Sequence, residues 1–148
     1  GPNESHKGSQ KRMVSQAFNQ IRTLGNVKLF SSHNREYGNG EQLRDFIHVD
    51  DCVDTMIWLF ENYQISGLFN LGTGIPRTFV DLAKAVFNSL NLEVDIQFID
   101  IPENIRNQYQ YYTCANMIRL RSMGLEKNFM SLEEGIKKFV DLEMKSIF

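Results

Sequence analysis

The sequence predicts a single α/β domain, and three observations lead to this prediction. Segments with apolar residues at helical spacing alternate along the 148 residues with short runs of β-branched and aromatic residues. Two hydroxyl residues, Thr78 and Ser131, are each followed three positions later by an acidic residue, which is the pattern of a helix capping box. The content of 42% hydrophobic and 11% aromatic residues is enough for one sizeable core.

The first element is a predicted helix over residues 9–24. Gly25 follows it as a C-terminal stop. Its apolar face consists of Met13, Val14, Ala17, Phe18, Ile21 and Leu24. A short strand is predicted over residues 27–30. The polar segment 31–43 contains two glycines and is long for a loop, so we expect it to be either functional or mobile.

The next stretch, RDFIHVDDCVD at residues 44–54, joins a predicted buried strand to a helix. The residues suited to the strand are Phe46, Ile47 and Val49. Either Asp50 or Asp51 can cap the N-terminus of a helix over residues 51–63 by accepting a backbone N–H. The apolar residues that this helix directs toward a core are Val53, Met56, Ile57 and Phe60.

The second half of the chain continues the alternation of strands and helices. A buried strand is predicted over residues 68–71, followed by the turn Gly72-Thr73-Gly74. Thr78 and Asp81 form the first capping box, which opens a helix through about residue 90. A strand over residues 94–99 follows.

The last segments are a predicted loop over residues 102–110 and a short helix over residues 115–123. Ser131 and Glu134 form the second capping box. They open a final helix through about Lys145.

Arg44 is the residue with the clearest chemical potential. An arginine just ahead of a buried strand can hold a phosphate oxygen bidentately, in a geometry that lysine does not offer. The alternative is that Arg44 pairs with Asp45 or another surface carboxylate, because such pairs are common and weak. A further set of carboxylates, Asp50, Asp51 and Asp54, has the spacing of a helix start, and we expect no metal there.

Composition and charge exclude several classes of protein. The net charge is -2, with a basic first third that suits an anionic ligand but is too sparse in cations to indicate nucleic-acid binding. Cys52 and Cys114 have no metal-ligand spacing and no disulfide framework, so we expect reduced thiols. No apolar run approaches the roughly 20 residues that cross a bilayer, and no signal-peptide layout is present. We therefore expect a soluble, cytoplasmic chain with no membrane partner.

Four segments in order carry a resemblance to a known family. They are GPNE at residues 1–4, RDFIHVDDCVD at 44–54, FNLGTG at 69–74 and TFVDLAKAV at 78–86. The chain thereby resembles the extended short-chain dehydrogenase/reductases, which include nucleotide-sugar epimerases and dehydratases. Within this family, HKGS at residues 6–9 and QYQYYT at 108–113 resemble one subgroup, the ADP-glycero-manno-heptose 6-epimerases.

The resemblance implies that residues 1–148 are one part of such an enzyme. The chain has neither the GxxGxxG turn nor the YxxxK pair of the family. It is therefore expected to be the C-terminal substrate-binding portion of an extended short-chain dehydrogenase/reductase, with the N-terminal Rossmann half absent from this chain. It would include the last strand and helix elements that pack on that half, and we expect it to expose apolar surface for that half on the helix 51–63 and the strand 68–71. The initial Gly-Pro is either part of the family segment GPNE or a tag remnant.

The implied activity is inversion of the sixth carbon of ADP-heptose, for lipopolysaccharide precursor synthesis. The subgroup oxidises that carbon with NADP and then returns the hydride to the opposite face. NADP would be bound mainly by the missing half, so the fragment alone would be inactive, and the complete enzyme is expected to be a homo-oligomer. The alternatives are another extended nucleotide-sugar 4-epimerase or dehydratase, and a non-catalytic nucleotide-sugar-binding relative.

The resemblance also implies roles for particular residues. Lys7 matches a catalytic lysine that acts as a second acid/base and is also expected to contact the cofactor; without the resemblance, His6 and Lys7 would be surface loop residues. A lysine base requires a pKa lowered toward neutrality. The positions that match substrate contacts are Ser9, Asn19, Phe30, Ser31, Ser32, Arg44 and Tyr109. Gln16 and Gln20 are the alternatives to Asn19.

Overall fold

The structure, a computed structural model, describes residues 13–145 and has the predicted α/β class. The helices are α1 (Met13–Leu24), α2 (Val49–Glu61), α3 (Phe79–Ser89), α4 (Glu103–Arg106), α5 (Ile118–Ser122) and α6 (Leu132–Lys145). The strands are β1 (Val27–Phe30), β2 (Leu43–Arg44), β3 (Arg77–Thr78) and β4 (Ile96–Ile99).

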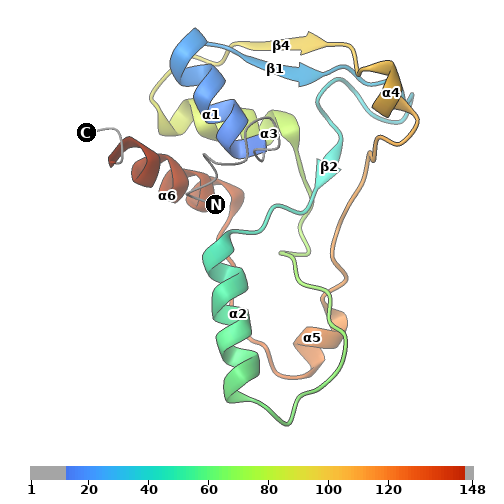
Figure 1. The fold of residues 1–148 in the computed structure, drawn as a ribbon, viewed down its shortest axis with the longest axis vertical. Coiled ribbons are helices and arrows are strands. Elements are labelled where there is room, and N and C mark those ends of the chain that lie inside the picture. Colours follow the sequence, from blue (N-terminus) through green and yellow to red (C-terminus); the bar gives the residue numbers. More distant parts are fainter. Residues whose placement is uncertain (1–12, 146–148) are drawn as a thin grey trace.

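The main core lies in a layered unit made of α1, α3, α6 and the β1–β4 pair (Figure 1). β1 and β4 are parallel, with Val27 opposite Ile96. α3 packs against both α1 and α6 and supplies the centre of the core. Phe18 of α1 meets Phe139 of α6 edge-on, with ring centroids 5.9 Å apart. Apolar residues from three distant parts of the sequence therefore close a single core.

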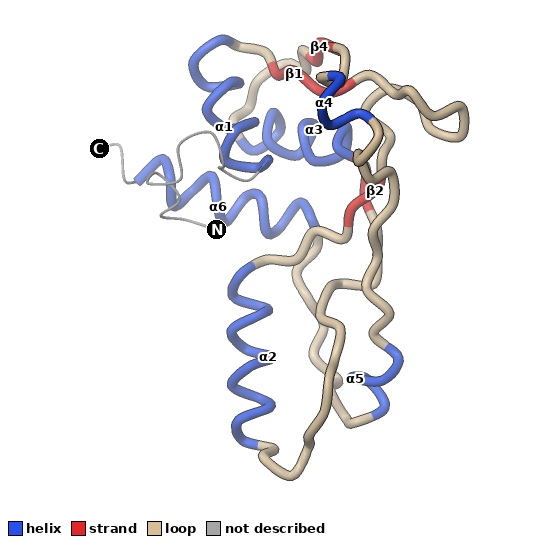
Figure 2. Tube along the Cα trace, turned by 45° about the vertical axis from the view of Figure 1, so that its right-hand side comes forward, coloured by secondary structure: helices blue, strands red, loops and turns tan. Residues whose placement is uncertain are grey.

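A second unit extends away from these layers. α2 runs outward from the layered unit, and α5 lies across from it in the same extension (Figure 2). A small cluster of Met117, Leu120 and Leu125 packs there against Trp58, Leu59, Phe69 and Leu71. The buried carboxylate of Asp51 accepts a hydrogen bond from Met130 N at 3.0 Å, and Lys127 Nζ lies 2.7 Å from Asp54. These contacts tie α2 to the segment that leads into α6.

Both predicted capping boxes are confirmed. Asp81 N donates to Thr78 Oγ1 at 2.9 Å, and Thr78 N donates to the Asp81 carboxylate at 3.2 Å. At α6, Ser131 N donates to the Glu134 carboxylate at 2.8 Å, and Glu134 N donates to Ser131 Oγ at 3.2 Å. The two helices that carry most of the core therefore begin where the sequence indicates.

The strand predicted at residues 46–49 is wrong. The ladder is formed earlier in the sequence, by β2, because its antiparallel partner β3 is opposite Leu43 and Arg44. Phe46 gains its packing from the ring of Phe79, edge-on at 5.6 Å, rather than from a neighbouring strand. The capping prediction for Asp50 or Asp51 is wrong as well: the N-cap of α2 is His48, whose Nδ1 accepts from Asp50 N at 3.2 Å.

The strand predicted at residues 68–71 is also wrong, because no described segment pairs with it. Leu68 is 85% exposed. The outer face of α2 is uncovered in the same way: Ile57 is 50% and Phe60 83% exposed. These two side chains therefore do not reach a core here, and the expectation that α2 exposes apolar surface is confirmed.

The loops differ from the prediction in two places. Residues 102–110 contain the single helical turn α4, and the helix predicted over residues 115–123 is shortened to α5. The polar segment 31–43 is held by specific contacts: Ser32 N donates to Asn39 Oδ1 at 2.8 Å, and His33 N donates to the Tyr111 hydroxyl at 2.9 Å.

Gly40 anchors the end of this segment. Its φ of 72° is a left-handed conformation that favours glycine, and a Cβ there would lie 2.7 Å from Val80 Cγ2. Gly40 O accepts from Val80 N at 3.1 Å. The segment is thus fastened to the start of α3.

Candidate functional site

The candidate site is built around β2, which has a neighbour on both edges. On one edge Arg44 is opposite Arg77 of β3. On the other edge Leu43 N donates to Tyr111 O at 2.8 Å, and Thr113 N donates to Leu43 O at 3.1 Å. β2 is therefore the middle of three extended segments, which fixes the position of the residues it carries.

The guanidinium of Arg44 is held by carbonyl oxygens and aromatic rings. It donates to Leu43 O at 2.8 Å and to Gln110 O. Its Cζ lies 5.8 Å from the ring centroid of Phe79 and 6.0 Å from that of Tyr109. These contacts orient a planar cation without neutralising it.

Within the part of the chain that the structure describes, no carboxylate forms an ion pair with Arg44. Arg77, by contrast, meets both Asp81 and Glu133, at 3.1 and 2.7 Å. A guanidinium has five N–H donors, so Arg44 keeps donors beyond those given to the two carbonyls. An arginine with free donors and no carboxylate nearby is suited to a bidentate anion.

The carboxylate of Asp45 is occupied by hydrogen bonds from other segments and does not pair with its neighbour Arg44. Its Oδ1 accepts from Thr73 N at 2.7 Å and from Thr73 Oγ1 at 2.5 Å. Its Oδ2 accepts from Gly74 N at 2.9 Å and from Ala115 N at 3.0 Å. Partial burial alone would raise the pKa of Asp45, but these hydrogen bonds to the charged form outweigh burial and hold the pKa below its usual value.

The turn Gly72-Thr73-Gly74 does not fit a dinucleotide pyrophosphate. The N–H groups of Thr73 and Gly74 already donate to Asp45, so they are not presented to a phosphate. A Cβ on Gly72 would collide with the Asp45 carboxylate and lie 2.6 Å from Ala115 Cβ. The glycine is needed so that the turn can approach this carboxylate.

A cavity of about 530 Å³ opens beside this arrangement, between α1, β1 and the 109–111 segment. The ring of Tyr109 meets that of Phe30 edge-on at 5.8 Å, so two aromatic rings form part of the wall. The full lining is Met13, Gln16, Gln20, Leu24, Lys28, Leu29, Phe30, Gln42, Phe79, Ile99 and Tyr109. Phe79 and Tyr109 also contact the Arg44 guanidinium, so the cation lies next to the cavity wall.

Gln42 fixes the tyrosine in this wall. The residue is 1% exposed, and its Nε2 donates to the Tyr109 hydroxyl at 3.0 Å. Among the described residues its Oε1 has no hydrogen-bond partner. A buried amide with one unused polar atom is uncommon, because leaving it unpaired costs free energy.

The structure brings together only some of the residues that the resemblance singled out. Phe30 and Tyr109 line the cavity, and Arg44 contacts Tyr109. Gln16 and Gln20 line it too, whereas Asn19 does not.

The two serines after β1 lie outside the cavity lining. Ser31 N continues the ladder of β1 by donating to Ile99 O at 2.8 Å. The hydroxyl of Ser32 donates to Asn34 O at 2.8 Å. Lys7 and Ser9 lie outside the described residues.

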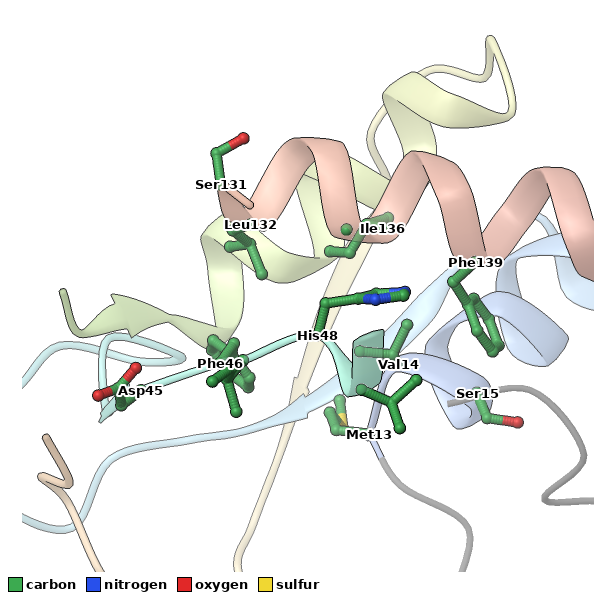
Figure 3. A pocket seen from close by; sticks show the side chains of 13 residues that line it. Met13, Val14, Ser15, Asp45, Phe46, His48, Ser131, Leu132, Ile136 and Phe139 are labelled. Atoms are coloured by element: carbon green, nitrogen blue, oxygen red, sulfur yellow. The ribbon is translucent and has the colours of Figure 1, made fainter. Parts of the chain in front are cut away.

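A second, smaller cavity of about 260 Å³ lies between α1, the segment 45–49 and the start of α6. Figure 3 shows the imidazole of His48 pointing into it, between Ile136 and Phe139 on one side and Val14 on the other. In the described part of the chain, the buried Nε2 of His48 has no hydrogen-bond partner. The walls are mostly apolar, and among the described residues that line them Asp45 is the only carboxylate, with no lysine or arginine.

The aspartates at the start of α2 are used in ion pairs. Asp50 meets Lys138, and Asp51 and Asp54 meet Lys127, at 3.6 and 2.7 Å respectively. Residues 13–145 contain no group of three or more His, Cys, Asp or Glu side chains placed to hold a metal. No helix within the same range is long and apolar enough to cross a membrane.

Sequence reasoning missed two residues of this site. The sequence presents Asp45 only as a partner of Arg44, and nothing local indicates that its carboxylate oxygens accept from residues 73, 74 and 115. Gln42 stands in a polar loop with no pattern that predicts burial. Both depend on segments that are distant in the sequence.

The comparisons with known proteins agree with this architecture. Residues 1–72 match the model of the NAD dependent epimerase/dehydratase family. The ADP-L-glycero-D-manno-heptose-6-epimerase of Nitratidesulfovibrio vulgaris (strain DP4) is 44% identical over 140 residues, covering 95% of this chain and 43% of that protein. The enzyme of the same name from Fusobacterium nucleatum is 42% identical over 146 residues, covering 95% of this chain and 44% of that protein.

The first half of the chain is thus similar to the NAD dependent epimerase/dehydratase family. Within that family, the curated relatives just described are heptose 6-epimerases. The chain spans less than half the length of these relatives.

Solved structures share the fold. A UDP-N-acetylglucosamine 4-epimerase from Methanobrevibacter ruminantium M1, in complex with UDP-N-acetylmuramic acid, superposes with a TM-score of 0.79 at 18% identity. The match covers 99% of this chain and 43% of that one. The ADP-L-glycero-D-manno-heptose-6-epimerase of Helicobacter pylori superposes with a TM-score of 0.75 at 24% identity, covering 96% of this chain and 40% of that one.

Proposed function

We propose that the chain is the C-terminal, substrate-binding portion of an ADP-glycero-manno-heptose 6-epimerase. The observation that carries the proposal is Arg44, a cation with unused donors and no carboxylate among the described residues, set against an aromatic-walled cavity. The 44% identity to a heptose 6-epimerase over nearly the whole chain supports the choice of subgroup.

In this proposal Arg44 binds the diphosphate of the nucleotide sugar. Its guanidinium is already oriented by Gln110 O and by the rings of Phe79 and Tyr109, so little side-chain entropy is lost when the anion binds. The cavity next to it, with Phe30 and Tyr109 in its wall, accepts the adenosine. Ser31 and Ser32, which follow β1, and Asn19 of α1 are proposed substrate contacts beside it. Gln16 and Gln20, which line the cavity, are the alternatives to Asn19.

Lys7 is the proposed acid/base in this portion, and Ser9 a proposed substrate contact. Both belong to the HKGS segment that precedes α1. Lys7 would hold or release a proton at its Nζ near the reacting carbon. This requires a lysine pKa near neutrality, which burial or neighbouring cations can produce.

NADP would be held mainly outside this chain. This placement is supported by the Gly72–Gly74 turn, whose N–H groups are occupied by Asp45. The exposed apolar face of α2, with Ile57 and Phe60, is the proposed surface on which the cofactor-binding half packs. The complete enzyme is expected to be a homo-oligomer.

The proposal is tested by calorimetric titration of the complete protein with ADP, which lacks the reacting sugar. Arg44→Ala should weaken ADP binding by about 1.5–3 kcal/mol, roughly 10- to 150-fold, which is the range of a hydrogen bond to a charged group. Arg35→Ala is the matched control, because Arg35 is an exposed arginine of the neighbouring loop. It should leave the Kd of ADP within about twofold, as expected for a screened surface charge.

The same titration separates the proposal from its rivals. UDP binding as tightly as ADP would favour a relative that acts on a UDP sugar. Equal losses in Arg44→Ala and Arg35→Ala would show that only general charge attracts the nucleotide. Turnover of ADP-heptose by the complete protein distinguishes an epimerase from a non-catalytic binding relative.

A further inference from the structure

We infer that Asp45 is a positioning residue for the nucleotide-sugar site and that it acts through Arg44. The inference rests on the proposed function, since it assumes that Arg44 binds the diphosphate. It assigns to the aspartate of the RDF segment a role distinct from that of the arginine beside it.

The first argument is that Asp45 joins segments that are far apart in the sequence. Its two carboxylate oxygens accept four hydrogen bonds, all between 2.5 and 3.0 Å, from Thr73, Gly74 and Ala115. The carboxylate therefore connects the end of β2 to the 72–74 turn and to the segment that follows residue 110. Loss of this group would leave three backbone N–H groups, in two separate segments, without their acceptor.

The second argument is that Arg44 and Asp45 hold the same segment at two points. Arg44 donates to Gln110 O, and Asp45 accepts from Ala115 N. Between these points Tyr111 and Thr113 pair with Leu43. The orientation of the Arg44 guanidinium thus depends on a segment whose other end is fixed by Asp45.

The third argument is that the site requires an acceptor-only side chain. Every partner of Asp45 is a backbone N–H or a hydroxyl, so a charged carboxylate satisfies all of them. An asparagine of the same shape would point an NH₂ group at N–H donors. The collision that a Cβ at Gly72 would make with the carboxylate indicates that the turn closes tightly on this group.

The experiment is a double-mutant cycle on the complete protein, with the Kd of ADP measured by calorimetry. Asp45→Asn should weaken ADP binding by roughly tenfold, because the guanidinium is no longer held in place. In an Arg44→Ala background the same substitution should cause a further loss of less than about twofold, since residues that act through one another are not additive. A merely structural role would not produce this dependence on Arg44.

A second variant guards against a folding failure of Asp45→Asn. Thr73→Val removes one hydroxyl donor to the carboxylate and leaves both Asp45 and Arg44 in place. It should weaken ADP binding by about two- to fivefold in the wild-type background only. Asp54→Asn, the same chemical change at an exposed carboxylate of α2, should leave the Kd unchanged.

The outcomes distinguish this inference from the proposed function. Wild-type protein that does not bind ADP would overturn both. A second outcome would overturn the inference alone. In this outcome the wild-type protein binds ADP, but the loss in affinity from Asp45→Asn or Thr73→Val multiplies with the loss from Arg44→Ala in the double variant. An unchanged Kd of ADP in both Asp45→Asn and Thr73→Val would also overturn the inference and leave the proposed function intact.

Discussion

Two neighbouring side chains of opposite charge, Arg44 and Asp45, have different partners. Arg44 donates to backbone carbonyls and contacts aromatic rings, whereas Asp45 accepts from N–H and O–H donors. Arg44 is the last residue of β2 and Asp45 directly follows it, yet the two side chains bind different segments of the chain. The ion pair between them that sequence proximity favours is therefore not formed.

Lys7 is expected to affect chemistry rather than binding. Lys7→Met keeps the side-chain length but removes the proton carrier, so kcat of the complete enzyme on ADP-heptose should fall by roughly a hundredfold or more while KM stays within a few-fold. The pH–rate profile should lose one limb. The measurement is steady-state kinetics of Lys7→Met and Arg44→Ala on the same substrate, since Arg44→Ala should mainly raise KM. An unchanged kcat in Lys7→Met would reduce Lys7 to a surface or binding residue.

Asp45 should make stability depend on acid pH. Its pKa is lower in the folded protein than in an unfolded chain, because its hydrogen bonds favour the charged form. The ordinary pKa of an aspartate is near 4, and the resulting stabilisation is complete at pH values above it. The stabilisation is lost as the pH falls through the lower pKa of the folded state. The Tm difference between wild type and Asp45→Asn should therefore shrink between pH 7 and about pH 3. A difference that stays constant over this range would contradict the assignment.

At the scale of elements, the start of α3 depends on a single hydroxyl, that of Thr78. Thr78→Ala removes the acceptor for Asp81 N, and α3 packs on both α1 and α6. The expected loss in the free energy of unfolding is about 1 kcal/mol, within the range measured for helix caps. The measurement is urea unfolding, and Thr113→Ala is a matched control at an exposed threonine. A loss as large in the control would show that the capping bond is not responsible.

The elements that sequence patterns predicted correctly are those whose information is local. The apolar face of α1 and the caps of α3 and α6 depend on residues within a few positions of each other. The strands at residues 46–49 and 68–71 failed because a strand is defined by its partner. Residues 43–44 have β3 as a partner, whereas residues 68–71 have no strand partner among the described residues. For the same reason Arg44 could be singled out, while its support at Gln110 and the junction at Asp45 could not.

At the scale of the whole molecule, this chain should bind adenine nucleotide without binding the redox cofactor tightly. The purified 148-residue chain is expected to show no submicromolar affinity for NADP in calorimetry, because the Gly72–Gly74 turn is occupied by a carboxylate. It is also expected to lack epimerase activity. A submicromolar Kd for NADP would show that the cofactor site has been misplaced.

The pairing of β1 with β4 has a consequence for how the chain acquires its structure. Val27 is opposite Ile96, so β2, α2, β3 and α3 all lie between the two strands in the sequence. Parallel strands with such separation form late, because the intervening chain must close a long loop before their contacts are gained. On the ribosome, α1 and β1 would emerge long before the residues that cover them. Their apolar faces would then be exposed to chaperones or to neighbouring nascent chains until α6 is synthesised.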